Sequence, residues 1–162
     1  MTRRFTHYWT NETWERERRL QQAGRAGDRL DHIASNQFVK RGVESGDDVY
    51  PVTVLDGGLY LLGRLEVDKV CGVGEAARLL KKATTDLYEA DDHIIAARST
   101  YKHFDLEVPT GLAEQLTFVG GGVTKRLKFD LPGHLNRQTL RGVRELHPQS
   151  AAELDKLLSS AQ

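Results

Sequence analysis

The chain has little cysteine and no long apolar run. Its single cysteine, Cys71, excludes an internal disulfide framework and a zinc site built on cysteines. Such sparing use of cysteine suits a reducing compartment, so we expect a cytoplasmic protein. No apolar stretch is long enough to span a bilayer, and the first residues lack the apolar centre of a secretory signal. We therefore expect no membrane partner.

Net charge is also absent, because 23 basic residues balance 23 acidic ones. The distribution is uneven. Residues 1–46 carry nine basic and six acidic residues, and residues 125–144 carry six and one, whereas residues 47–124 carry seven and thirteen. Two basic segments on a neutral chain predict one local phosphate-contacting face. Ordinary surface charge that happens to cluster explains the same pattern, and both interpretations stay open here.

Several motifs of known chemistry are missing. There is no Gly-x-Ser-x-Gly elbow for a nucleophile. The stretch 72–75 lacks a third glycine, and Gly120–Gly122 lacks the Lys-Ser/Thr of a phosphate loop, so both are interpreted as turns. The run 91–93, with His103, offers metal-ligand types, but consecutive side chains diverge, which favours a solvated loop. We expect no metal, no cofactor and no catalytic residue.

Hydrophobic periodicity and turn residues predict an α+β fold in one domain over 1–162. Strands are expected over 4–10, 49–55, 59–67, 93–97, 116–119 and 126–129. Helices are expected over 13–23, 74–83, 110–116, 136–143 and 151–158. Interleaved short elements without regular βαβ spacing favour a small, strongly bent barrel with short helices packed around it.

Glycine, proline and capping residues predict where the turns, bulges and helix ends lie. Asp56-Gly57 predicts a hairpin between 49–55 and 59–67. Pro51 predicts an edge or a bulge, and Gly63 a bulge or a close backbone approach. Asn11 is expected to cap the first helix, and Ser150 with Glu153 to form a capping box on the last.

Aromatic and amide side chains gather in two segments. The first fourteen residues hold both tryptophans, and Tyr8, Trp9 and Trp14 offer flat rings. Short hydrogen-bonding side chains accompany them: Thr10, Asn11, Ser35, Asn36 and Gln37. Stacking on a ring contributes about 1–3 kcal/mol per base, and amides suit base edges. The combination predicts a site for a planar heterocycle such as a nucleobase. The alternative is that Trp9 belongs to the core and Asn11 only caps a helix.

The order of motifs resembles a known family. A Tyr8-Trp9 strand end is followed by a polar helix, by Ser35-Asn36-Gln37-Phe38, and by Gly46-Asp47-Asp48-Val49 entering a hairpin. The hairpin contains Gly-x-x-x-Val over 63–67, and a Pro-x-Ser helix closes the chain. This order resembles the EVE branch of the PUA-like superfamily, related to YTH and ASCH domains. The resemblance covers about residues 1–70, and 140–160 more loosely.

The resemblance implies a bent five- or six-stranded PUA-like barrel with a cleft that takes in a base. Family members accept a base, often a modified one, that is flipped out of DNA or presented in RNA. The implied base-binding residues are Tyr8, Trp9, Thr10, Asn11, Trp14, Ser35, Asn36 and Gln37. The implied phosphate contacts are Lys40, Arg41, Lys125, Arg126 and Lys128. Typical EVE domains place an apolar residue after Tyr-Trp, whereas this chain has Thr10.

We therefore expect a non-catalytic reader of a modified nucleobase in DNA or RNA, acting alone or beside a nuclease in bacterial defence. One alternative is a small ASCH-like hydrolase acting on a modified nucleoside, with Lys40 as a polarising group and Asp47 or Glu66 as base. Another alternative is a protein-interaction module, which predicts an exposed apolar patch.

Overall fold

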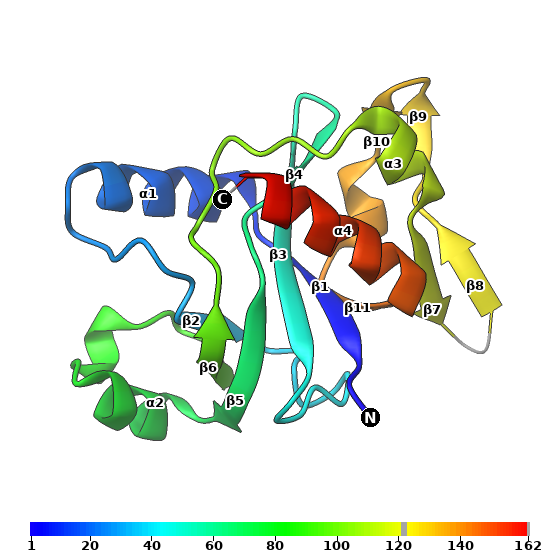
Figure 1. The fold of residues 1–162 in the computed structure, drawn as a ribbon. Helices are drawn as coiled ribbons and strands as arrows, with labels where there is room; N and C mark the ends of the chain where they lie inside the picture. Colours follow the sequence, from blue (N-terminus) through cyan, green and yellow to red (C-terminus); the bar gives the residue numbers. More distant parts are fainter. Residues whose placement is uncertain (121–122, 162) are drawn as a thin grey trace.

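The computed structural model describes residues 1–120 and 123–161 and shows a mixed sheet with helices packed around it (Figure 1). The strands are β1 (Arg4–Tyr8), β2 (His32–Ser35), β3 (Asp48–Leu55), β4 (Gly58–Leu61), β5 (Leu65–Cys71), β6 (Asp92–Ser99), β7 (Thr117–Gly120), β8 (Val123–Arg126), β9 (Phe129–Leu131), β10 (His134–Leu135) and β11 (Val143–Leu146). The helices are α1 (Asn11–Gln22), α2 (Val73–Leu80), α3 (Thr110–Gln115) and α4 (Pro148–Ala161), with 3-10 turns η1 (Thr84–Asp86) and η2 (Arg137–Leu140). Within these ranges, no helix combines the length and the apolar character needed to cross a bilayer.

The main sheet runs in the order β2-β6-β5-β3-β1-β11-β7-β8, with β4 paired to β3. The central pair β1–β3 is parallel, and the remaining pairs of this sheet are antiparallel. No described pairing joins β2 to β8, so the sheet is open. The α+β class is confirmed, but the sheet is not a closed barrel.

Two apolar clusters pack on the sheet. The first joins Tyr50 of β3 and Phe118 of β7 to Leu154 of α4. Helix α4 crosses the central strands in Figure 1. The second joins Phe5 of β1 to Trp14 of α1. Because side chains alternate along a strand, β1 and β3 serve both clusters and form the centre of the molecule.

The expected hairpin forms, but the strand expected over 59–67 is split into β4 and β5. β3 pairs first with β4 and then with β5, and the interruption falls at Gly63. A Cβ on Gly63 would lie 2.5 Å from Thr100 Oγ1 and 2.9 Å from the Tyr101 carbonyl oxygen. The expected close backbone approach is therefore confirmed. The Pro51 carbonyl accepts from Leu62 N at 2.9 Å, so the proline faces this interruption, where its missing donor is tolerated.

Both predicted helix caps are wrong. The cap of α1 is Thr10, whose side chain accepts from Thr13 N at 3.2 Å, and Asn11 is already helical. Ser150 is buried inside α4, and its Oγ accepts from Thr117 N at 2.8 Å. It therefore fastens α4 to β7 and does not form a capping box. α4 begins at Pro148, a residue that suits the first turn because it has no N–H to satisfy.

The region after residue 120 differs most from expectation. The helix predicted over 136–143 is the short turn η2, and the chain then enters the unexpected strand β11. Gly142 has a φ of 76°, a conformation that ends helical backbone and suits glycine. β8 begins at Val123, earlier than expected, whereas the strand expected over 93–97 is confirmed within β6. Gly121 and Gly122 lie outside the described residues, so the turn predicted there stays a prediction.

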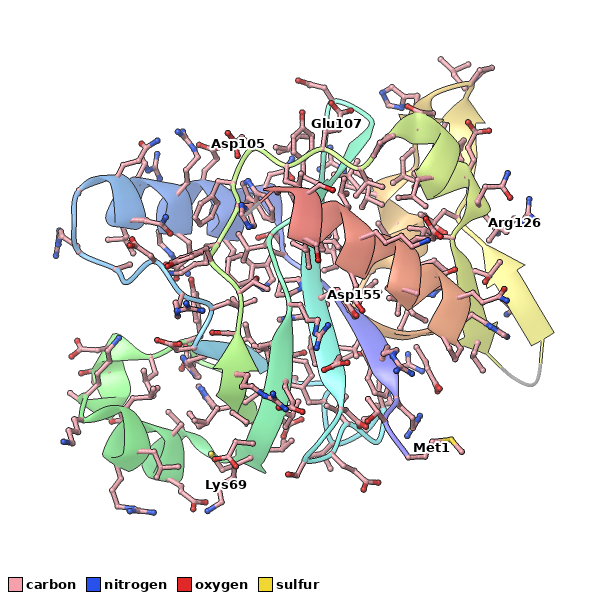
Figure 2. All side chains as sticks on the ribbon, viewed as in Figure 1. Met1, Lys69, Asp105, Glu107, Arg126 and Asp155 are labelled. Carbon is pink, nitrogen blue, oxygen red and sulfur yellow. The ribbon has the colours of Figure 1, made fainter. Side chains whose placement is uncertain are left out.

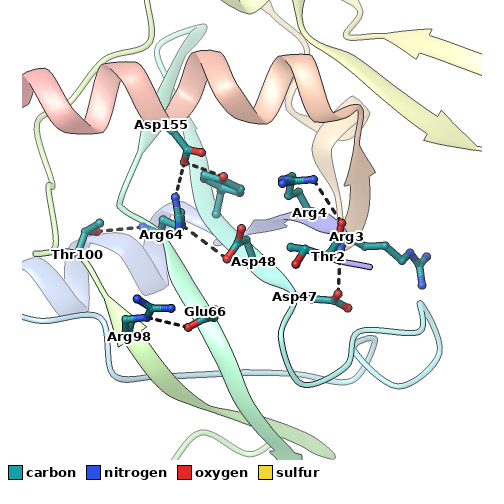
Figure 3. Close-up of polar contacts among 11 residues, drawn as sticks. Thr2, Arg3, Arg4, Asp47, Asp48, Arg64, Glu66, Arg98, Thr100 and Asp155 are labelled. Atoms are coloured by element: carbon teal, nitrogen blue, oxygen red, sulfur yellow. Dashed lines mark hydrogen bonds and ion pairs between the residues drawn. The ribbon is translucent and has the colours of Figure 1, made fainter.

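A charged network joins α4 to the sheet (Figure 3). Arg64 lies between Asp155, at 3.1 Å, and Asp48, at 3.6 Å. The Tyr50 hydroxyl donates to the same Asp155 oxygen that pairs with Arg64, at 2.8 Å. Burial raises the pKa of Asp48 above its ordinary value. This network connects α4 to β3 and to the segment between β4 and β5.

Candidate functional site

A hollow rich in charged side chains has a volume of about 520 Å³ and is formed beside β1, β11 and β7. Its charged lining residues are Arg3, Lys40, Arg41, Lys125, Arg141, Arg144 and Glu145. Six of the seven are cationic. We call this site the basic hollow.

Segments far apart in the sequence supply these cations. Lys40 and Arg41 lie in the turn between β2 and β3, where Arg41 N donates to the Gln37 carbonyl at 3.0 Å. Lys125 comes from β8, and Arg144 from β11. The structure thus brings basic residues of 1–46 and of 125–144 to one place.

Most of this charge has no acidic partner. Arg3 pairs with Glu145 at 2.8 Å. Arg144, by contrast, lies over the Phe118 ring at 4.2 Å and donates to the Thr139 carbonyl. Burial, followed by the charge of Arg41, holds the pKa of Arg144 below its ordinary value. Within the described residues, no carboxylate pairs with Arg144. The basic hollow therefore carries an excess of positive charge.

Two predicted phosphate contacts lie elsewhere. Side chains alternate along β8, so Arg126 faces away from Lys125 and lines a separate hollow with Gln149 and Glu153. Figure 2 shows Arg126 at the margin of the molecule. Lys128 is exposed and lines neither this hollow nor the basic one. Lys40, Arg41 and Lys125 are the three predicted contacts that the structure brings together.

The predicted rings are largely covered. Trp9 is 7% exposed and Trp14 is fully buried, with their rings edge-to-face at 6.3 Å. Trp14 also packs edge-to-face on Phe104 at 5.4 Å. Tyr8 is half-buried against the other cluster, on the opposite face of the sheet. None of these three rings lines the basic hollow.

The segment 35–37 is ordered by its own side chains. Ser35 Oγ accepts from Gln37 N at 3.1 Å. Asn36 Oδ1 accepts from Asp91 N at 2.7 Å and lines a hollow of about 710 Å³ beside η1. The Gln37 amide lies against Gly142, where an added Cβ would be 2.9 Å from Gln37 Oε1. Among these residues, Gln37 is the one that adjoins the basic hollow, since Arg141 and Val143 line it on either side of Gly142.

Thr10 and Asn11 separate at the start of α1. Thr10 is exposed and acts as the helix cap. Asn11 Oδ1 lies 3.1 Å from the Thr53 hydroxyl. It lines a hollow of about 500 Å³ whose polar lining residues are Asn11, Asp56, Asp130, His134, Asn136, Arg137 and Gln138. We call this site the amide hollow.

Gln138 lines both the basic hollow and the amide hollow. The two are therefore adjacent, with η2 between them. Sequence reasoning missed every polar residue of the amide hollow except Asn11. The Asp56-Gly57 turn was foreseen, but only the fold shows that it meets residues 130–138.

The candidate bases of the hydrolase alternative have structural partners. Asp47 is 4% exposed, and its two carboxylate oxygens accept from Arg3 N and Glu44 N at 3.0 and 2.9 Å. Glu66 pairs with Arg98 at 3.0 Å. Both oxygens of Asp47 are therefore engaged by backbone N–H groups, whereas Arg98 contacts only Oε2 of Glu66.

The candidate metal ligands are likewise engaged. His93 Nε2 contacts the Ala90 carbonyl at 3.0 Å, and His93 Nδ1 lies 2.8 Å from His32 Nε2. Asp92 Oδ2 accepts from Val39 N at 3.0 Å. Within the described residues, no group of three or more His, Cys, Asp or Glu side chains is arranged to hold a metal ion.

No protein-family model matches this chain. A search of curated proteins also finds no match. The two adjacent hollows are therefore the features of this chain that point to a function.

Proposed function

We propose that this protein binds nucleic acid and holds its phosphates in the basic hollow. The observation that carries the proposal is the convergence of six cationic side chains with one carboxylate, Glu145, which Arg3 already pairs. Arg and Lys are the residues that neutralise phosphates, and the release of counterions then drives binding. A neutral protein can bind in this way because the interaction depends on local charge.

The proposal includes the finer expectations from the resemblance. In it, the chain is an EVE-type domain whose bent sheet corresponds to a PUA-like barrel, and it reads a modified base in DNA or RNA without catalysis. A nuclease partner and a cytoplasmic location belong to the same proposal. The open sheet and the buried tryptophans mean that the base site has to lie away from those two rings, in a polar hollow.

Neighbouring residues on β8 provide the test. Lys125 lines the basic hollow, whereas Arg126 faces the hollow beside α4. We expect Lys125→Gln to weaken binding to a labelled oligonucleotide and to reduce the slope of log K against log salt by about 1. Fluorescence anisotropy over a salt series measures both quantities.

Arg126→Gln is the matched control, since it removes one charge from the same strand. It should leave affinity and salt slope unchanged. Equal losses in the two variants would show diffuse attraction without a site at the hollow. No binding of the wild-type protein to single-stranded DNA, duplex DNA or RNA at low salt would end the proposal.

A further inference from the structure

The amide hollow differs in charge from its neighbour. On one side of η2 the charged lining is cationic apart from Glu145, and on the other side it contains two carboxylates, Asp56 and Asp130, and one cation, Arg137. Gln138 borders both hollows. A nucleotide with its phosphate in the basic hollow would be repelled by these carboxylates if it entered backbone first, so the base is the part that fits beside them.

Free hydrogen-bonding groups are available in the amide hollow. Asp130 Oδ1 accepts from Asn136 Nδ2 at 3.0 Å, which leaves Oδ2 for a ligand. Asp56 is exposed, and no hydrogen bond or ion pair to its carboxylate occurs in the described part of the chain. Asn11 Oδ1 lies against the Thr53 hydroxyl. The Nδ2 group of the same amide remains as a hydrogen-bond donor. The wall therefore offers carboxylate acceptors beside an amide.

These groups match one class of base. Carboxylates accept hydrogen bonds from exocyclic amino groups, as on N4 of cytosine. Thymine and uracil have carbonyl oxygens in place of that amino group, and these acceptors are repelled by a carboxylate. The volume of about 500 Å³ lies within the range of small-molecule sites.

We propose that the amide hollow takes an unpaired nucleobase that carries an exocyclic amino group, with Asp56 and Asp130 as acceptors and Asn11 as an orienting amide. This inference rests on the proposed function, because phosphates in the basic hollow bring the base to Gln138. It assigns base selectivity to side chains of the hairpin turn and of residues 130–138, outside the aromatic segment.

Two homopolymers test the selectivity. Oligo-dC and oligo-dT of about ten nucleotides differ at the position that this site reads. We expect the wild-type protein to bind oligo-dC about tenfold more tightly, by anisotropy at one salt concentration. Asp56→Asn should reduce that ratio severalfold, since an amide can donate to a carbonyl as well as accept. This substitution is compatible with the fold, because Asp56 has a φ of 49° and asparagine tolerates this conformation.

Asp68→Asn, at an exposed aspartate of β5 outside both hollows, is the control and should preserve the ratio. Equal affinities for the two homopolymers, with Lys125→Gln still weakening both, would overturn base selectivity while supporting the proposed function. A ratio that survives Asp56→Asn and Asp130→Asn would also overturn the assignment to this hollow. No binding to either homopolymer or to duplex DNA at low salt would remove the proposed function itself.

Discussion

His7 shows how much one buried residue contributes to the behaviour of the molecule. It lies on β1, is 6% exposed, and packs edge-to-face on Phe38 at 4.9 Å. Its Nδ1 has no hydrogen-bond partner within the described residues. Burial lowers the pKa of His7 to about 3. The imidazole is therefore neutral in the folded state at any pH at which the carboxylates are ionised.

Stability should consequently fall in mild acid. An unfolded His7 takes up a proton below about pH 6.5, whereas the folded state does so only near pH 3. The unfolded state binds more protons within that window, so the free energy of unfolding decreases as the pH falls. We expect His7 alone to account for about 2 kcal/mol between about pH 7 and pH 5. Urea denaturation at both pH values, on wild type and His7→Leu, measures the difference.

His134→Leu, at an exposed histidine, is the control and should keep the full decrease. His32 adds to the decrease in both proteins, because burial, followed by the proximity of His93, lowers the pKa of His32 to about 4. An unchanged pH dependence in His7→Leu would show that His7 is hydrated in the native state.

The sequence did not predict which of the aromatic side chains are buried. The cluster of rings in residues 1–14 was visible, but periodicity does not say whether another segment covers a ring. Trp14 is buried because Phe104, ninety positions away, packs against it. The predicted cations Lys40, Arg41 and Lys125 all line the basic hollow. Arg141 and Arg144 were counted in the basic segment 125–144 but were not named as contacts, because strand β11, which carries Arg144, was not expected.

At the level of elements, the close packing at Gly63, between β4 and β5, predicts that a larger residue there destabilises the fold. Gly63→Ala places a methyl group 2.9 Å from the Tyr101 carbonyl oxygen, a backbone atom. The strands must shift, and we expect a loss of about 1–3 kcal/mol in the free energy of unfolding. Chemical denaturation gives the value.

Gly74→Ala is the matched control, since Gly74 lies in α2 with open space around its Cβ position. Alanine is preferred over glycine within a helix, so this variant should gain about 0.5–1 kcal/mol. Losses of equal size at both sites would mean that Gly63 has no special packing.

Elements with local signals were the predictable ones. The Asp-Gly hairpin, α2, α3 and the strand over 93–97 follow from alternation and turn residues. The predicted caps failed because the side chains of Asn11 and Ser150 have distant partners, Thr53 and Thr117, that the local sequence does not reveal. β11 was missed because its place is fixed by pairing with β1 and β7, which is a tertiary preference.

At the scale of the whole molecule, charge is separated while net charge is zero. The basic hollow gathers residues from both ends of the chain, and the acidic middle segment supplies Asp56 to the amide hollow. Segment charge counts indicated a basic face, but only the fold could place the two hollows next to each other. Binding should therefore depend on which charge is removed more than on how much charge the protein carries.

Two variants with identical net charge test this dependence. Glu145→Gln removes the carboxylate that lines the basic hollow and frees Arg3, while Glu153→Gln removes a carboxylate of α4 that lines the hollow with Arg126. We expect Glu145→Gln to bind single-stranded DNA about fivefold more tightly at low salt, with the gain shrinking as salt screens it. Glu153→Gln should bind like wild type, because its charge lies at another hollow. Equal gains in both variants would assign affinity to overall charge and leave the basic hollow without a specific role.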